Sequence, residues 1–245
     1  MATRLFRLLD AFSMERPELT LSEISRASGL PLSTTHRLVA ELTRWGALRR
    51  GSNGLYHIGL RLWQLGSLSP GTLRLREQAM PFMEDLHGVT QHNVQLAVLD
   101  GTEAVSIERL SARGAVNMVT RTASMLPLHA SGAGLMLLAH ADADVQEKVL
   151  AGPLRRYTER TVTAPARLRE VLADARRDGY VISVQQIEMI SQSLAAPVRG
   201  ADNSVIAALS VVVPVEGVDL RALVPAVRAS ALGISRTLGA TSRRG

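Results

Sequence analysis

The feature that most limits the possible folds of this chain is a short capped helix followed at once by a tight turn and a second helix. Thr20 and Glu23 have the spacing of a capping box, which predicts a helix over residues 21–28. Gly29 is suited to end this helix in the left-handed conformation, and Pro31 prevents it from continuing. Two helices joined by such a turn form a helix-turn-helix, so the sequence predicts this motif near its N-terminus.

The second of these helices, predicted from Ser33 to Trp45, has one face for packing and one face for solvent. At about 100° per residue, the packing face carries Thr35, Leu38, Val39, Leu42 and Trp45. The side chains on the opposite face are short and polar near the start of the helix, and arginines follow further along. A DNA recognition helix requires this arrangement. The alternative is an ordinary solvated face. Because the capped helix and the turn precede it, we predict DNA contacts from Ser33, Thr34, His36, Arg37 and Arg44.

A β-hairpin is predicted directly after this helix, because Asn53-Gly54 stands between two short strand-like runs. A hairpin in this place is the wing of a winged helix-turn-helix. Arg49, Arg50 and Asn53 are therefore candidates for contacts to phosphate or to the minor groove, with a merely solubilising hairpin tip as the alternative. Residues 1–66 hold nine Arg and five Asp or Glu, and so carry four of the six net positive charges of the chain.

The chain is predicted to divide into three parts. Residues 1–67 form the winged helix-turn-helix domain, which begins with a helix from Ala2 to Met14 and ends with a short helix over residues 59–67. Residues 68–88 form a linker helix, and residues 89–245 form a larger domain. The first helix has more apolar surface than so small a domain needs, from Leu5, Leu8, Leu9 and Phe12. We therefore expect part of it to pair two copies of the chain in a symmetric dimer.

The larger domain alternates predicted strands and helices, which gives an α+β fold with helices packed on a mixed, mainly antiparallel sheet. The strands are expected over residues 92–100, 103–110, 116–121, 180–184, 194–198 and 205–213. The helices are expected over residues 134–140, 144–151, 166–178 and 219–238. Because residues 205–213 are apolar on both faces, this strand should lie in the centre of the sheet.

Six sequence blocks occur in an order that is typical of one family. They are Gly29–Leu42, Gly54–Gly66, Leu126–Gly134, Asp178–Tyr180, Leu194–Val198 and Ala207–Ser210. Together they resemble the isocitrate-lyase-regulator (IclR) family of bacterial transcription factors. The resemblance implies a winged helix-turn-helix, a linker helix and a GAF-like domain that binds a small-molecule effector. It also implies homodimers, often paired into tetramers, on palindromic double-stranded operator DNA.

The resemblance also implies an effector pocket. At matching positions it would be lined by Met118, Leu126, Gly132, Ala133, Ser183, Ser193 and Ser210. For Met118 and Leu126, a plain role in the core is the alternative. The small residues around Gly132 lead into a helix, whose first backbone amides favour an anion such as a carboxylate.

Four departures from the family's pattern bear on the ligand. Ser183 stands where an Asp is usual, Leu135 where a Lys is usual, and Gln185-Gln186 where a Glu pair is typical. Ile190 replaces a glycine, and should either narrow the cavity or form one apolar wall. An uncharged pocket fits a neutral or singly charged molecule better than a compact dianion, whose second charge would be buried without a partner. We therefore expect an aromatic or branched aliphatic acid.

Several other kinds of site are excluded or disfavoured. The chain has no cysteine, which excludes disulfides and thiolate metal sites, and we expect no metal and no cofactor. No apolar run reaches the roughly 18 residues that span a bilayer, so we expect no membrane partner and a cytoplasmic protein, associated with the nucleoid when bound to DNA. Gly132-Ala-Gly134 lacks the third glycine of a dinucleotide fingerprint. His129 is expected to be structural.

The sequence therefore favours a DNA-binding transcriptional regulator, with repression expected, over an enzyme. The alternative is an enzyme that processes small acids or esters and carries a fused DNA-binding domain. The sequence contains no Gly-x-Ser-x-Gly nucleophile elbow that would support this alternative.

Overall fold

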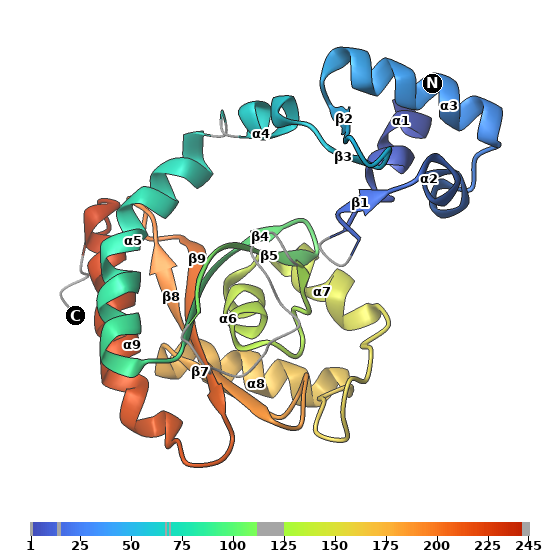
Figure 1. The fold of residues 1–245 in the computed structure, drawn as a ribbon. Coiled ribbons are helices and arrows are strands. Elements are labelled where there is room, and N and C mark those ends of the chain that lie inside the picture. Colours follow the sequence, from blue (N-terminus) through green and yellow to red (C-terminus); the bar gives the residue numbers. More distant parts are fainter. Residues whose placement is uncertain (1, 14–15, 67, 69, 112–124, 242–245) are drawn as a thin grey trace. The chain divides into compact units, whose positions relative to one another are not determined.

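The computed structural model describes residues 2–13, 16–66, 68, 70–111 and 125–241. The chain divides into two compact units, Met1–Leu73 and Arg74–Gly245, which we call the N-terminal and C-terminal units (Figure 1). The boundary between them falls inside the predicted linker, and the three-part division stays a prediction. Within the described residues, no helix is both long and apolar enough to cross a membrane.

The N-terminal unit has the predicted winged helix-turn-helix. In chain order its elements are α1 (Ala2–Leu9), β1 (Glu18–Leu19), α2 (Leu21–Ser28), α3 (Leu32–Trp45), β2 (Leu48–Arg50), β3 (Tyr56–Ile58) and α4 (Leu60–Gly66). The strands form an antiparallel sheet in the order β1-β3-β2, and the β2–β3 hairpin is the wing. The sequence pattern does not predict β1, because two residues are too few to show an alternation.

The two ends of α2 are fixed by the residues that the sequence indicates. Glu23 N donates to Thr20 Oγ1 (3.2 Å), and Thr20 N donates to Glu23 Oε2 (2.7 Å), so both halves of the capping box are present. The hydrogen bonds from Thr20 also hold the pKa of Glu23 below its usual value. Gly29 ends α2 with a φ of 65°, in the left-handed region. The chain therefore enters α3 in a direction that is set locally.

Two predictions about the helices of this unit were wrong. Helix α1 ends at Leu9 and not at Met14, because Phe12 N donates to Leu9 O (3.1 Å), an i to i−3 bond that closes a turn and ends the helical ladder. Trp45 is 46% exposed and does not pack in the core. The buried stripe of α3 ends at Leu42, so the last turn extends past the small core, and the Trp45 ring instead lies 4.7 Å from the guanidinium of Arg61.

The C-terminal unit has the predicted α+β fold. Its elements are α5 (Pro70–Thr90, which begins before the boundary), β4 (Asn93–Asp100), β5 (Glu103–Leu110), β6 (Met125–Leu126), α6 (Gly132–His140), α7 (Ala143–Ala151), α8 (Pro165–Asp178), β7 (Val181–Val184), β8 (Ser191–Arg199), β9 (Val205–Pro214) and α9 (Leu220–Thr237). The sheet order is β6-β5-β4-β9-β8-β7, and each strand pair in the described residues is antiparallel. Strand β9 is central, as predicted. The strand predicted over residues 116–121 lies outside the described residues.

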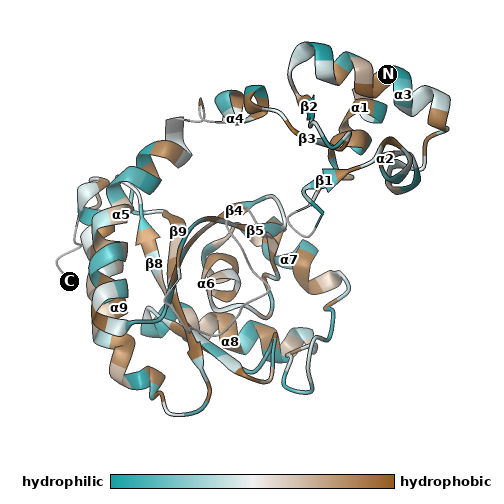
Figure 2. Ribbon diagram, in the orientation of Figure 1, coloured by the Kyte–Doolittle hydropathy of each residue, from teal (hydrophilic) through white to brown (hydrophobic). Residues whose placement is uncertain are grey.

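The sheet of this unit has helices on both faces (Figure 1). On β8, Leu194, Ala196 and Val198 belong to the core cluster that α5 and α9 complete, whereas Ala195 belongs to the cluster with α6 and α8. Side chains alternate between the faces of a strand, so the part of a strand that is covered on both sides is mainly apolar. Figure 2 shows this hydrophobic character along most of β9, whereas β8 is apolar over Leu194–Val198 and polar at its start, Ser191–Ser193.

Helix α6 lies close to its face of the sheet because small residues meet there. The strands contribute Ala97, Ala104, Ala195 and Ala208 to the cluster around this helix. At the start of α6 the contact is tightest: a Cβ on Gly134 would lie 2.5 Å from Pro127 O and from Ser131 Oγ. The preceding segment therefore folds directly over the first turn of α6.

Replacing Gly134 with Ala should destabilise the C-terminal unit by about 1–3 kcal/mol, because the new methyl group meets backbone atoms that cannot move aside cheaply. Urea unfolding followed by circular dichroism measures the change. Gly88→Ala is the matched control, because a Cβ there meets nothing within 4 Å and Gly88 lies inside α5. That substitution should stabilise the protein by about 0.5–1 kcal/mol. Equal effects of the two substitutions on the free energy of unfolding would contradict the close contact assigned to Gly134.

Candidate DNA interface and effector pocket

The outward face of α3 presents the residues that the sequence predicts for DNA contact. Thr35, Leu38, Val39 and Leu42 are buried against the rest of the unit. Thr34 is half-buried, and the exposed candidates on the helix are Ser33, His36, Arg37 and Arg44. The polar face is therefore available to a ligand outside the unit, and its contact with DNA stays a prediction.

The start of α3 differs from the start of α2 in its capping. Pro31 stands at the N-cap of α3 and has no side-chain hydrogen bond to the first turn, whereas Thr20 caps α2. The first backbone N–H groups of a helix have no partner within the helix and carry the positive end of its dipole. Together with Ser33 and Thr34, this uncapped turn suits the approach of a phosphate oxygen.

Arg37 has an ion-pair partner on its own helix. Its Nη1 atom lies 3.3 Å from Glu41 Oε1, one turn further along, and the side chain of Arg37 is 59% exposed. An exposed pair of this kind contributes only about 0.3–0.5 kcal/mol. Arg37 can therefore leave Glu41 for a guanine edge or a phosphate at little cost.

The wing residues are divided between shaping the hairpin and facing solvent. Asn53 Oδ1 accepts from Leu55 N (3.1 Å), and Asn53 Nδ2 donates to Glu18 Oε2 (3.2 Å), so this side chain holds the turn and ties it to β1. Arg50 Nε donates to Gly54 O (3.2 Å), and its guanidinium lies 5.6 Å from the Tyr56 ring centre. Arg49 is exposed and is the wing cation least engaged by the hairpin.

The predicted effector residues converge on one cavity of about 40 Å³ in the C-terminal unit. Of the seven candidates, the cavity is lined by Leu126, Gly132, Ala133, Ser183, Ser193 and Ser210. Met118 lies outside the described residues. The cavity is therefore built where the first turn of α6 covers β7, β8 and β9.

Strand register explains why the three serines meet. Ser183 is directly opposite Ser193, and Ser193 is opposite Val212, two residues from Ser210 on β9. Residues that are opposite in an antiparallel pair, or two apart on one strand, share a face of the sheet. All three side chains consequently lie on the face that α6 covers.

The start of α6 is more fully hydrogen-bonded than the sequence suggests. Gly132 N donates to Ser193 Oγ (3.2 Å), and Gly134 N donates to Ser131 Oγ (2.9 Å), which caps the helix. Ser183 Oγ donates to Ala130 O (2.6 Å). We expected the first backbone amides of α6 to be available to an anion, but the amide of Gly132 is already bonded to a side chain.

Several residues of the cavity are missed by the sequence analysis. They are Gln95, Ala130, Ser131, Gln186, Ile187, Glu188, Ser191, Gln192 and Val212. Gln95 could have been found, because it is a lone polar residue within the apolar run of β4.

Our expectation for Ile190 was wrong. Its side chain is 63% exposed and does not line the cavity, and Ile187 lies there instead. The loop from β7 to β8 turns between these two residues, which a linear pattern does not reveal.

The same loop explains the two glutamines that stand where the family has acids. Gln186 Oε1 accepts from Val162 N (3.1 Å), and Gln185 Nε2 donates to Met189 O (2.7 Å). Thr161 Oγ1 and Thr158 Oγ1 donate to the backbone carbonyls of Gln186 (2.7 Å) and Gln185 (2.6 Å). The glutamine side chains fix the loop that forms one wall of the cavity.

His129 has a structural role, as predicted. Its Nε2 atom lies 2.8 Å from Arg155 O, and its ring centre lies 5.9 Å from that of Tyr157. Both contacts attach the loop after α7 to the segment before α6. In the described part of the chain, no group of three or more His, Cys, Asp or Glu side chains is placed to hold a metal ion.

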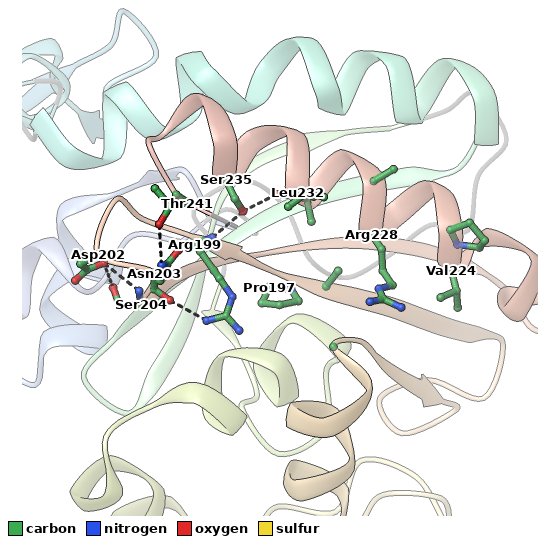
Figure 3. A pocket seen from close by; sticks show the side chains of 16 residues that line it. Pro197, Arg199, Asp202, Asn203, Ser204, Val224, Arg228, Leu232, Ser235 and Thr241 are labelled. Carbon is green, nitrogen blue, oxygen red and sulfur yellow. Dashed lines mark hydrogen bonds between the residues drawn. The ribbon is translucent and has the colours of Figure 1, made fainter. Parts of the chain in front are cut away.

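A second, larger cavity of about 1000 Å³ lies beside α9 and the end of β8 (Figure 3). Asp202 accepts from Ser204 Oγ (2.6 Å) and from Ser204 N (3.0 Å), and these bonds lower the pKa of Asp202. Arg199 Nη1 donates to Asn203 O (2.8 Å) on the same side. None of the six described effector candidates lines this cavity, so it is separate from the predicted pocket.

Comparisons with known proteins identify the family. Residues 1–52 match the IclR helix-turn-helix domain, and residues 70–236 match the C-terminal domain of the bacterial transcriptional regulator IclR. The HTH-type transcriptional regulator XynR of Escherichia coli (strain K12) is 30% identical over 241 residues, which cover 96% of each chain. The transcriptional repressor IclR of the same strain is 30% identical over 217 residues, covering 87% of this chain and 79% of the relative.

Solved structures agree with this assignment. An IclR homolog from Microbacterium hydrocarbonoxydans, complexed with 4-hydroxybenzoate, is 43% identical and superposes with a TM-score of 0.91, covering 96% of this chain and 97% of that chain. The curated relatives are named as regulators of transcription, which argues against the enzyme alternative. This chain therefore belongs to the IclR family of DNA-binding transcriptional regulators, with an N-terminal helix-turn-helix domain and a C-terminal effector-binding domain.

Proposed function

We propose that this regulator is a repressor that binds operator DNA through α3 and the wing, and releases it when a small aromatic acid enters the cavity beside α6. The observation that carries the proposal is that six residues predicted for effector binding line one cavity. A relative that is 43% identical holds 4-hydroxybenzoate, and two E. coli relatives are named repressors. Such a protein acts in the cytoplasm, at the nucleoid when bound to its operator.

Effector binding requires the cavity to expand. A volume of about 40 Å³ holds a few water molecules, whereas a cavity that admits a benzene ring is on the order of 150 Å³. The ligand therefore stabilises a form in which the cavity is wider than in this structure. A ligand that binds one conformation better shifts the population toward it, and this is how occupancy changes DNA affinity.

The carboxylate of the effector is assigned to the first turn of α6. Ser193 Oγ accepts from Gly132 N at 3.2 Å, and rotation of this hydroxyl releases the amide to a stronger, charged acceptor. The positive end of the α6 dipole favours the anion there. The Ser193 hydroxyl then donates a hydrogen bond to the same carboxylate.

The DNA-binding form is proposed to be a homodimer, with dimers paired through the effector domains. In α1, Leu8 is buried in the core of its own unit and Leu5 and Leu9 are half-buried against it, as is Phe12 beyond the end of the helix. The surplus apolar surface that we expected from these four residues is therefore largely used within the unit. Phe6 lies on the outer side and is 61% exposed. We propose that Phe6 lies at the two-fold contact between the N-terminal units, and that the two α3 helices bind the half-sites of a pseudo-palindrome.

Arg37→Ala should weaken binding to the specific operator by about 1–3 kcal/mol if Arg37 reads a guanine. The free energy of unfolding should change by no more than about 0.5 kcal/mol, which is the contribution of an exposed ion pair. Fluorescence anisotropy at fixed salt measures the affinity. Arg167→Ala is the matched control, because Arg167 is also an exposed, ion-paired helix arginine but lies in the C-terminal unit. Unchanged operator affinity in Arg37→Ala rules the assignment out.

Ser193→Leu should abolish the response to the effector and leave operator affinity intact, because the larger side chain fills the cavity in the unit that does not bind DNA. Ligand-dependent release of DNA in a gel-shift assay is the measurement, with a thermal-shift screen of aromatic acids on the native protein to supply the ligand. Ser230→Leu, on α9 and outside the cavity lining, should respond like the native protein. Ser193→Ala, which cannot overfill the site, should fold normally and bind the ligand more weakly.

Light scattering at micromolar concentration should give at least twice the 26.4 kDa mass of one chain.

Phe6→Glu should weaken binding to the full palindrome by at least about tenfold and leave half-site binding unchanged, since it places charge at the proposed two-fold contact. Val89→Glu is the control, because Val89 is 79% exposed on a different helix. A monomer that binds one half-site with full affinity contradicts the dimer.

A further inference from the structure

Two buried polar atoms in the effector cavity lack a hydrogen-bond partner among the described residues: Glu188 Oε2 and Ser210 Oγ. Ser210 is 1% exposed, so water on the protein surface does not reach its hydroxyl. A buried polar group without a partner costs about 1–3 kcal/mol. Neither atom has a partner among the described residues, so a bound ligand can supply one to both.

The neighbouring polar groups show that these two are exceptions. Ser183 Oγ donates to Ala130 O, Ser193 Oγ accepts from Gly132 N, and Gln186 Oε1 accepts from Val162 N. These bonds hold the cavity walls together. Glu188 and Ser210 make no such bond to a described residue through these two atoms, so both atoms remain open to a ligand.

The chemistry of the two atoms selects the ligand group. An ionised carboxylate only accepts hydrogen bonds, whereas a serine hydroxyl both donates and accepts. A ligand hydroxyl can donate to Glu188 and accept from Ser210 at the same time. A methyl group leaves both atoms unsatisfied, and a second ligand carboxylate is repelled by Glu188.

We propose that Glu188 and Ser210 form a hydroxyl-selective end of the effector pocket, so that the effector is a hydroxy acid. This inference rests on the proposed function in taking the cavity as the effector site. It adds a charged residue to a pocket that the sequence predicts to be uncharged. The ligand carboxylate lies at the first turn of α6, and the hydroxyl lies at the loop between β7 and β8 that carries Glu188.

The loop presents Glu188 in a fixed position. Thr161 Oγ1 holds the carbonyl of Gln186, and Ser191 N donates to Glu188 O at 3.4 Å. The loop is therefore held by hydrogen bonds on both sides of the Glu188 side chain. A fixed acceptor in a buried site discriminates strongly against a ligand that lacks the matching donor, because the acceptor is then left unpaired.

The test is a calorimetric titration of the full-length protein with matched pairs of acids. The aromatic pairs are 2-, 3- and 4-hydroxybenzoate, each against the methylbenzoate of the same substitution. Aliphatic hydroxy acids and their methyl analogues are titrated in parallel. At least one hydroxy acid should bind at least about tenfold more tightly than its methyl partner.

Variants then assign the preference to the two residues. In Glu188→Gln and in Ser210→Ala, the hydroxy-to-methyl preference should fall to less than about threefold, while the methyl acid binds as it does to the native protein. Retained affinity for the methyl acid also shows that each variant is folded. Glu216→Gln is the matched control, because Glu216 is an exposed glutamate of the same unit, outside the cavity lining.

The outcomes separate this inference from the function on which it rests. Binding of aromatic acids with no preference for the hydroxyl overturns the inference and leaves the proposed effector class standing. A preference seen only in the aliphatic pairs overturns the aromatic class and supports the role of Glu188 and Ser210. A preference that persists in both variants, or binding of no acid in either series, overturns the inference.

Discussion

The close contact between the first turn of α6 and strand β8 is the constraint on which the C-terminal unit depends. A Cβ on Gly132 would lie 2.7 Å from Ser193 Oγ, which accepts from Gly132 N, and Gly134 leaves room for the segment that folds back over the helix. With a larger residue at either position, α6 would stand further from the sheet. The same contact that packs the helix also places a helix N-terminus against a row of serines, so the packing of the fold and the polarity of the pocket have one origin.

The N-terminal unit depends on local chemistry to a greater degree. Its turn is set by the Thr20–Glu23 capping box and by the left-handed Gly29, and both act within a few residues. The position of α3 then decides which of its side chains reach solvent. Arg37 is held only by an exposed ion pair, and the wing is shaped by Asn53, so the unit presents exposed and weakly held cations on a locally hydrogen-bonded frame.

The effector pocket shows how polar residues can serve two purposes in one small space. Gln185 and Gln186 stand where acids are usual and use their amides to fix a loop, which keeps unbalanced charge out of that wall. Glu188 places one acidic side chain close by, and its Oε2 atom has no hydrogen-bond partner among the described residues. A cavity that is small, polar and closed by a hydrogen-bonded loop is suited to a ligand that both opens the wall and satisfies what the wall leaves unpaired.

The sequence by itself determined the helix-turn-helix, the wing, the central place of β9 and the family, because capping, turn chemistry and hydrophobic periodicity act over short stretches of chain. It also indicated six of the cavity residues, through the resemblance of short blocks. Only the tertiary structure decided that Ile187 and Glu188 line the cavity while Ile190 is exposed, that Gly132 is bonded to Ser193, and that Trp45 lies outside the core. These facts depend on which strands are neighbours and where a loop turns. Neither is recorded in the spacing of residues along the chain.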